Sequence, residues 1–303
     1  MKAVIIDKYG GPEVFRFADA PDPAPGPGDL LVRVAAASVN PFDIKQRTGE
    51  YKSFAPVQFP GILGGDFSGT VVKCGAAVKK FKPGDHVFAI GSHTYAELCV
   101  VSENNAAKIP PHLDPVDAAS LPVVVTTGHQ LAVMGADATG GKLILITGAV
   151  GSVGRTAVFV AKSRGARVIA GVRKSQVGAA QGLNADQVVA LDDPKAVADL
   201  PELDAVADTV NGATAELLLG KVKSGGIFAS VLGPPANAGK YPKVKVVPVI
   251  VKPDPATLEF FGEAIANGKF AVPIAARFPL AEAQKAHQMI KTDHPVGKVL
   301  LLP

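Results

Sequence analysis

Three glycines in the middle of the chain are spaced for binding a phosphate group. Gly148, Gly151 and Gly154 follow four apolar residues, 143–146, which are typical of a strand buried on both faces. Glycine alone would be weak evidence, but residues at helical spacing come next, over 156–163. A strand, a glycine turn and a helix in this order let backbone N–H groups approach a pyrophosphate. We therefore predict a dinucleotide site along Gly148-Ala149-Val150-Gly151-Ser152-Val153-Gly154.

A cationic segment follows the next expected strand and indicates which dinucleotide binds. An NAD-preferring site usually carries an acidic residue about 20 positions beyond the glycines, where it holds the ribose hydroxyls. Here that place is taken by Arg173, Lys174 and Ser175. Two cations and a hydroxyl suit a 2′-phosphate, which favours NADPH. The alternative is a solvated loop, in which Arg and Lys are common.

The composition describes a soluble globular protein with a substantial core. Of 303 residues, 48% are hydrophobic and 19% are charged, and the length allows two domains. The net charge of +4, without a long block of like charges, argues against a nucleic acid or a membrane surface as partner. We expect Cys74 and Cys99 to be buried thiols rather than a disulfide. With no secretory signal at the start, this favours the cytoplasm.

The pattern of the sequence changes twice, first from short strands and turns to alternating strands and helices, and then back. Residues 1–115 are rich in short strands and turns, and Asp43 could cap a short helix there. Strands then alternate with helices, which predicts a parallel sheet with right-handed crossovers. Prolines and glycines return over 233–251, which suggests a return to the first domain. The strands expected in the sheet are 143–146, 167–171, 187–190, 204–208 and 226–231, and helices are expected at 116–121, 126–134, 156–163, 214–222, 255–267 and 280–292.

Several short motifs, in their order and spacing, resemble the medium-chain dehydrogenase/reductase superfamily, specifically its zinc-free quinone oxidoreductase branch. Besides the glycine turn, they are Ser38-Val39-Asn40-Pro41-Phe42-Asp43, Ile62-Leu63-Gly64-Gly65-Asp66-Phe67-Ser68-Gly69, Pro83-Gly84-Asp85-His86-Val87, Thr94-Tyr95-Ala96-Glu97 and Gly297-Lys298-Val299. The resemblance covers essentially the whole chain. It implies an α/β fold in which a Rossmann domain, a doubly wound parallel sheet over 116–249, is inserted into a β-rich GroES-like catalytic domain of residues 1–115 and 250–303.

The resemblance also bears on zinc. Zinc alcohol dehydrogenases of the superfamily use a Cys where this chain has Asn40, and a His-Glu pair where it has Gly65-Asp66. Only Asp66 could still be a ligand, whereas a catalytic zinc takes three protein ligands. The four-cysteine structural lobe is also missing, and the histidines, His294 among them, stand alone. Without zinc as a Lewis acid, alcohol oxidation loses the means of stabilising an alkoxide, so no metal is expected.

The resemblance implies further residues around the cofactor and the substrate. Thr127, Val210, Leu232 and Gly233 are expected along the nicotinamide and ribose, and Lys298 is a further candidate for the phosphate. Relatives often place a Tyr after the next strand, but this chain has Val188-Val189-Ala190-Leu191, so the adenine end could be held more loosely. The substrate pocket is expected to be bounded by Asn40, Asp43, Tyr51, the turn at 62–66 and residues 246–251.

Tyr51 and Asn40 are the candidate catalytic residues. Tyr51 could donate a proton or a hydrogen bond to a carbonyl oxygen, or only cover an apolar pocket. We favour the second role, because no His or Lys partner for a relay is visible in the sequence. Asn40 could orient the nicotinamide ribose or the substrate oxygen, or only form the turn before Pro41.

These features favour an NADPH-dependent reductase that delivers hydride to quinones or α,β-unsaturated carbonyls without zinc. One alternative is an enone or alkenal double-bond reductase with little quinone activity. Another is a non-catalytic NADPH-binding protein, like the crystallin members of the superfamily. A regulatory or nucleic-acid-binding member is discounted by the missing basic run. Relatives commonly form homodimers, and here the strand at 226–231 with the region after Gly233 is the expected edge.

Overall fold

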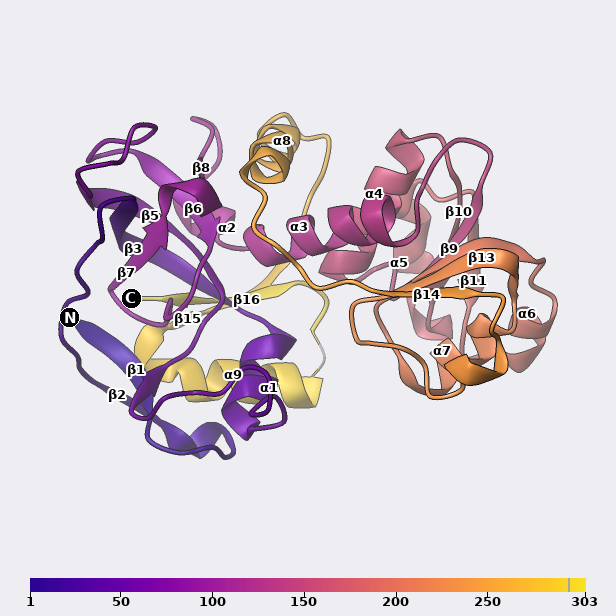
Figure 1. Ribbon diagram of the computed structural model, residues 1–303, viewed down its shortest axis with the longest axis horizontal. Coiled ribbons are helices and arrows are strands. Elements are labelled where there is room, and N and C mark those ends of the chain that lie inside the picture. The colour runs from indigo at the N-terminus through magenta and orange to yellow at the C-terminus, as the bar shows by residue number, and fades with distance from the viewer. Residues whose placement is uncertain (294) are drawn as a thin grey trace. The chain divides into compact units, whose positions relative to one another are not determined.

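The computed structural model describes residues 1–293 and 295–303, so His294 lies outside the described residues. The chain forms two compact units (Figure 1). Unit 1 comprises residues Met1–Val123 and Pro253–Pro303, and unit 2 comprises Val124–Lys252. The chain thus crosses between units at 123/124 and 252/253, where the sequence placed the domain limits at 115/116 and 249/250.

Unit 2 is built on one parallel sheet of six strands. The strand order is β11-β10-β9-β12-β13-β14, which is the order of the doubly wound dinucleotide-binding sheet and confirms the predicted fold class. The strands are β9 (Leu143–Thr147), β10 (Arg167–Val172), β11 (Gln187–Ala190), β12 (Leu203–Asp208), β13 (Val222–Ser230) and β14 (Lys245–Pro248).

Helices connect these strands and cover the sheet because each has an apolar face. α4 (Ser152–Ser163) runs from β9 towards β10 and buries Ala157, Val158, Val160 and Ala161. α7 (Gly212–Leu219) lies between β12 and β13, and its Leu218 belongs to a core cluster with Leu145, Val206 and Phe228. The other helices of this unit are α3 (Pro122–Gln130), which begins just before the unit does, α5 (Val177–Ala180) and α6 (Pro194–Ala198).

Two expectations for this unit were wrong. The helix expected over 214–222 ends at Leu219, and Val222 already begins β13. The segment 233–251, expected to return to the first domain, contains β14, which pairs in parallel with β13 from Ile227↔Lys245 to Ser230↔Pro248. β14 is too short and too charged at its start to stand out, and its Pro248 is tolerated at a sheet edge. β13 is therefore not an edge strand.

Unit 1 combines both ends of the chain in one sheet. This sheet has seven strands, of which six follow the order β15-β16-β3-β5-β6-β8 and the seventh, β7, pairs with β3. A second sheet has the order β2-β1-β4. The C-terminal strand β16 pairs antiparallel with β3 at Val299↔Val39, and Figure 1 shows this yellow strand among the purple N-terminal ones. The strands are β1 (Lys2–Ile6), β2 (Phe15–Asp19), β3 (Asp29–Val39), β4 (Gly61–Ile62), β5 (Asp66–Cys74), β6 (His86–Ile90), β7 (Leu98–Ser102), β8 (Ala106–Lys108), β15 (Ile274–Pro279) and β16 (Lys298–Leu302).

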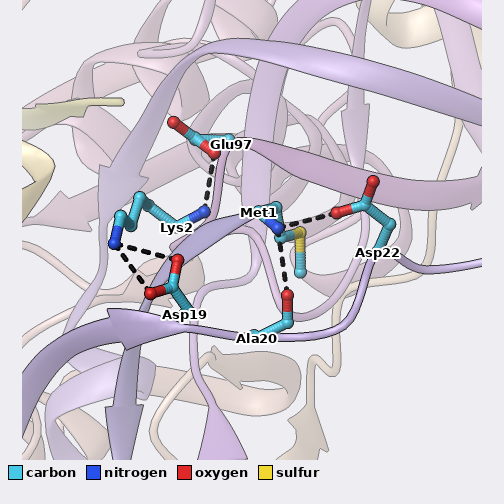
Figure 2. Close-up of polar contacts among 6 residues, drawn as sticks. All are labelled: Met1, Lys2, Asp19, Ala20, Asp22 and Glu97. Atoms are coloured by element: carbon cyan, nitrogen blue, oxygen red, sulfur yellow. Dashed lines mark hydrogen bonds and ion pairs between the residues drawn. The ribbon is translucent and has the colours of Figure 1, made fainter.

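Polar contacts fix the first strand at its start (Figure 2). The terminal ammonium of Met1 donates to Asp22 at 2.7 Å and to the Ala20 carbonyl at 3.0 Å. The backbone N–H of Lys2 donates to Glu97 at 2.6 Å, and the Lys2 side chain pairs with Asp19. These groups are largely exposed, so their role is to set the position of the strand rather than to add much stability.

The four helices of unit 1 that the structure describes are α1 (Pro41–Thr48), α2 (Pro115–Ala118), α8 (Pro255–Ala266) and α9 (Ala283–Asp293). The sequence suggested Asp43 as the N-cap of α1, but in the structure Asp43 lies inside this helix. The N-cap is Asn40, and Asp43 sits at the third helical position, from which its Oδ2 accepts the Asn40 backbone N–H at 2.8 Å. Cys99 is buried and Cys74 is half-buried, and both are free thiols. Across the described residues, no helix has the length and apolar character needed to cross a membrane.

Candidate active site

The glycine turn of unit 2 has the backbone geometry that a phosphate site needs. Gly148 follows β9 with φ +57°, which an L side chain rarely adopts, and its carbonyl accepts the N–H of Gly151 at 2.9 Å. Gly151 is the N-cap of α4 and has no side chain to cap it, and among the described residues no side-chain acceptor for the first-turn N–H groups is found. The first N–H groups of a helix have no partner within the helix, so they are available to an anion here.

Gly154 is required for another reason, namely close packing. A Cβ at this position would overlap the carbonyl oxygen of Gly148 and lie 2.9 Å from the Cα of Ala149. The first turn of α4 can therefore approach the glycine turn only if residue 154 lacks a side chain. We call the glycine turn, together with the first turn of α4 packed against it, the glycine cradle. Its backbone N–H groups fit a pyrophosphate.

A buried carboxylate holds the ends of three neighbouring strands together. Asp208, the last residue of β12, accepts from Thr147 of β9 at 2.9 Å and from Ser230 of β13 at 2.8 Å. It also accepts the backbone N–H of Val210 at 3.1 Å. Val210 and Leu232 are exposed beyond these strand ends, and Asn211 donates to the Leu232 carbonyl at 3.2 Å. The sequence had not singled out Asp208, because its partners lie on strands that only the sheet order brings together.

The predicted nicotinamide residues thus gather at one edge of the sheet. Val210 and Leu232-Gly233 follow the carboxyl ends of β12 and β13, beside the glycine turn that follows β9. Thr127 lies on α3, and its neighbour Gly128 packs against the first turn of α4, where a Cβ would lie 2.6 Å from the Val153 carbonyl oxygen. Ligands of open α/β sheets bind outside the carboxyl ends of the strands. As cofactor ligands these residues stay predictions.

The cationic segment lies at the same edge of the sheet. Arg173, Lys174 and Ser175 follow β10 directly and are exposed, and among the described residues no ion pair involves either cation. The backbone N–H of Lys174 donates to Asp192 at 2.7 Å. No sequence signal pointed to this carboxylate, because Asp192 follows β11, not β10. It anchors the backbone of the segment and leaves both cationic side chains free to reach a phosphate.

In unit 1, two buried charged side chains fix the amide of Asn40. The amide Nδ2 donates to Asp66 at 2.8 Å, and Oδ1 accepts from the Lys298 ammonium at 2.6 Å. Lys298 also donates to the Val39 carbonyl at 3.1 Å, and Ser38 donates to Asp66 at 2.6 Å. Asn40 therefore bridges a buried cation and a buried anion, so its orientation is set by charge at both ends.

Burial and charge act in opposite directions on Lys298. Burial lowers the pKa of its ammonium, while the carboxylates of Asp66 and Asp43 raise it. The second oxygen of Asp66 accepts the backbone N–H of Val123 at 3.0 Å, so this carboxylate has three donors. Lys298 was expected to bind the cofactor phosphate, which stays a prediction. In the structure its ammonium donates to the amide oxygen of Asn40 and so fixes that side chain.

A second buried chain runs from Asn40 to helix α9. Asp43 accepts the Asn40 backbone N–H and the Tyr95 hydroxyl, at 3.0 Å, and this hydroxyl lies 3.1 Å from Nε2 of His287. Since Tyr95 donates to Asp43, His287 must donate through Nε2–H. Its Nδ1 then has no partner among the described residues. In the sequence His287 stands alone, because its partner Tyr95 is 192 positions away.

The buried imidazole predicts a loss of stability in acid. Burial, with a smaller contribution from Arg47, lowers the pKa of His287 to about 3. Because the folded-state pKa lies below the unfolded value of about 6.5, the contribution of this group is present above pH 6.5 and is lost as the pH falls. Between pH 7 and pH 5 we expect a loss of about 2 kcal/mol from this residue. Urea unfolding at both pH values measures this loss by difference: from pH 7 to pH 5 the free energy of unfolding should change by about 2 kcal/mol less favourably in the wild type than in His287→Gln. The same change in both proteins would contradict it.

Tyr51 lies in an aromatic cluster on unit 1, beside α1. Its ring centroid is 4.5 Å from that of Phe54 and 5.5 Å from that of Phe42, and Phe54 is 65% exposed. Lys45 places its ammonium 5.0 Å from the Tyr51 ring and pairs with Glu50 at 2.8 Å. A lysine is therefore close to Tyr51, although none was visible from the sequence. Within the described part of the chain, Tyr51 makes no hydrogen bond to the group around Asn40.

The contacts of Asn40 and Asp66 bear on whether a metal could bind at these positions. Asn40 and Asp66 are hydrogen-bonded to each other and to protein cations or N–H groups. Within residues 1–293 and 295–303, no group of three or more His, Cys, Asp or Glu side chains could hold a metal ion.

Two family matches and several relatives fit this architecture. Residues 26–111 match the alcohol dehydrogenase GroES-like domain, and residues 183–301 match the zinc-binding dehydrogenase family. A chloroplast envelope quinone oxidoreductase homologue of Arabidopsis thaliana is 31% identical over 324 residues, covering 100% of this chain and 98% of that protein. The chloroplastic NADPH-dependent alkenal/one oxidoreductase of the same plant is 28% identical, covering 100% and 80%.

A solved structure of a quinone oxidoreductase matches the chain over its whole length. The quinone oxidoreductase from Coxiella burnetii has a TM-score of 0.88 to this chain at 28% identity, covering 100% of this chain and 99% of its own. The chain therefore belongs to the medium-chain dehydrogenase/reductase superfamily, in the branch of the quinone oxidoreductases. The resemblance predicted from the sequence is confirmed.

Proposed function

We propose that the protein is an NADPH-dependent oxidoreductase that reduces quinones or α,β-unsaturated carbonyl compounds without zinc. The observation that carries the proposal is the carboxyl edge of the unit 2 sheet. There an uncapped helix N-terminus and a glycine cradle lie at the same edge as two exposed cations. The names of the relatives, quinone oxidoreductase and NADPH-dependent alkenal/one oxidoreductase, support the same chemistry.

Each part of the site has a separate task in this proposal. The N–H groups of the glycine turn and α4 bind the pyrophosphate, and Arg173 and Lys174 bind the 2′-phosphate. Val210, Leu232 and Thr127 position the nicotinamide end. When bound, NADPH supplies the hydride, so the protein has mainly to bind, orient and exclude water. Asn40, held by Lys298 and Asp66, presents a fixed amide in unit 1.

Electron-poor conjugated carbonyls are the expected substrates. An enone or a quinone spreads the incoming negative charge through its own π-system onto an oxygen that one hydrogen bond can stabilise. A saturated ketone lacks this help and would need a Lewis acid, for which the positions of Asn40 and Gly65 supply no ligand. We expect purified enzyme to reduce naphthoquinones, benzoquinones, enals or enones at least about 100-fold faster than saturated ketones. NADPH oxidation, followed with each compound in turn, measures this ratio.

The same assay separates the alternatives. Turnover of enals and enones with little quinone reduction would make the protein a double-bond reductase. Tight NADPH binding without turnover of any compound would make it a non-catalytic binding protein, like the crystallin members. Efficient turnover of saturated alcohols, lost on chelation and restored by zinc, would contradict the proposal.

A homodimer and a cytoplasmic location also stay proposals. β14 leaves one edge of the unit 2 sheet open, so a dimer would join there rather than at β13. Size-exclusion chromatography with light scattering measures the assembly. The free thiols suit a reducing compartment, but the Arabidopsis relative is named for the chloroplast envelope, so an organelle is an alternative that cell fractionation decides.

A further inference from the structure

Reduction of a carbonyl compound by hydride consumes a proton, and the buried chain of unit 1 contains a group arranged to give one. Asp43 is 1% exposed, and its Oδ2 accepts two hydrogen bonds, from the Asn40 N–H and from the Tyr95 hydroxyl. Both donors therefore occupy the same oxygen. When the carboxyl is protonated, its proton has to sit on the other oxygen, Oδ1.

Oδ1 faces a place where a side chain is missing. A Cβ built at Gly65 would lie 3.6 Å from Asp43 Oδ1, and among the described residues, apart from those adjoining Gly65, no other heavy atom lies within 4 Å of it. Gly65 is half-buried, and its carbonyl accepts the N–H of Gly91 at 3.0 Å, so the turn is held in place. Any larger residue at position 65 would cover the carboxyl oxygen. Glycine leaves the space beside this oxygen unfilled by a side chain.

We propose that Asp43 is the general acid of the reaction, giving the proton on Oδ1 to the substrate oxygen across Gly65. The inference rests on the proposed reductase function. Hydride addition brings two electrons to the substrate and leaves a negative charge on its oxygen. The O–H bond of Asp43 then breaks as a new O–H bond forms on the substrate, which leaves an Asp43 carboxylate. After the product has left, the carboxylate regains its proton from water at the same oxygen.

The surroundings of Asp43 suit a group that exchanges a proton near neutral pH. Burial, reinforced by the Asp66 carboxylate, raises the pKa of Asp43 to about 7, against the opposing effects of the Asn40 N–H, Tyr95 and the Lys298 ammonium. His287 faces Tyr95 as a neutral imidazole, and Arg47 is the remaining cation near this hydroxyl. A general acid works best when its pKa lies near the working pH.

Tyr95 acts in this account as a positioning residue. Its hydroxyl, held by His287, donates to Oδ2 and so favours the carboxylate form of Asp43. Removing it in Tyr95→Phe should raise the pKa of Asp43. Since the protonated form is the active one, the fall in activity at high pH should then move to higher pH. A merely structural role for Tyr95 would leave this limb of the profile in place.

The test combines two variants with a direct titration. Asp43→Asn keeps an acceptor for both donors but has no exchangeable acid, and its kcat for quinone reduction should fall about 100-fold. Gly65→Ala adds one methyl group at ordinary contact distance from Oδ1, so it should fold and lower kcat about 10-fold or more by blocking the approach. Gly28→Ala in the same unit meets no atom within 4 Å and should leave kcat unchanged.

The direct titration does not depend on turnover. Infrared difference spectra of the protein alone, recorded across pH, should show a protonated carboxyl disappearing near pH 7, and Asp43→Asn should lack that signal. If the wild type reduces quinones or enones but its kcat is flat through pH 7 and both variants keep it, the general acid is not Asp43 and the reductase function stands. If the wild type reduces none of these compounds, the proposed function fails, whatever the carboxyl titration shows.

Discussion

Replacing Gly154 by valine is expected to weaken NADPH binding by at least about 100-fold, or about 2.8 kcal/mol. The side chain would overlap the Gly148 carbonyl and push the first turn of α4 away from the glycine turn. The backbone N–H groups that we propose bind the pyrophosphate would then point elsewhere, and each lost charge-assisted hydrogen bond costs about 1.5–3 kcal/mol. Fluorescence titration with NADPH measures the dissociation constant.

A second glycine of the same unit provides the control. Gly178 lies at a helix with no heavy atom within 4 Å of a built Cβ, so Gly178→Val should leave NADPH affinity within about twofold. Circular dichroism shows whether each variant is folded. A folded Gly154→Val protein with unchanged affinity would mean that the dinucleotide does not bind at this turn.

Replacing Arg173 and Lys174 together by alanine should weaken NADPH binding about 10- to 150-fold and leave NADH binding nearly unchanged. The 2′-phosphate carries close to two negative charges, and both cations are exposed, so screening leaves a net contribution of ~1.4–3 kcal/mol. The variant should also show a flatter dependence of NADPH affinity on salt, because two cations no longer contribute. Michaelis constants for both cofactors, at low and high salt, measure these effects.

The matched control removes the same charge from another part of unit 2. Lys195 and Lys240 are exposed and lie on other elements, so Lys195→Ala with Lys240→Ala changes the net charge equally. This variant should keep the preference for NADPH. If the Arg173/Lys174 variant keeps it too, the 2′-phosphate is bound elsewhere.

Local patterns predicted most of unit 2. Runs of apolar residues flanked by glycine identify strands such as β9, and the glycine turn is encoded within seven residues, 148–154. β14 escaped because it is a short edge strand that starts with a lysine and ends with a proline. Its place in the sheet depends on pairing with β13, which no local signal encodes.

The buried polar chain of unit 1 could not be predicted from the sequence, for a physical reason. Tyr95 is 52 positions from Asp43 and 192 from His287, and each residue alone is unremarkable in its segment. The packing of α9 brings His287 to Tyr95, and the pairing of β16 with β3 brings Lys298 to Asn40. Asn40 was identified, yet its partner Lys298 was expected to bind a phosphate. The sequence shows that Lys298 is charged, but not that the fold buries it beside Asn40.

Transfer of hydride from NADPH to the substrate can be followed directly with deuterium. NADPH deuterated at the transferred position of its nicotinamide is mixed with the enzyme and an enone, and the product is analysed by mass spectrometry and NMR. We expect one deuterium per product molecule, at the β-carbon, and slower turnover with the deuterated cofactor. Product without deuterium, or no product above the enzyme-free control with any enone or quinone, would contradict the account.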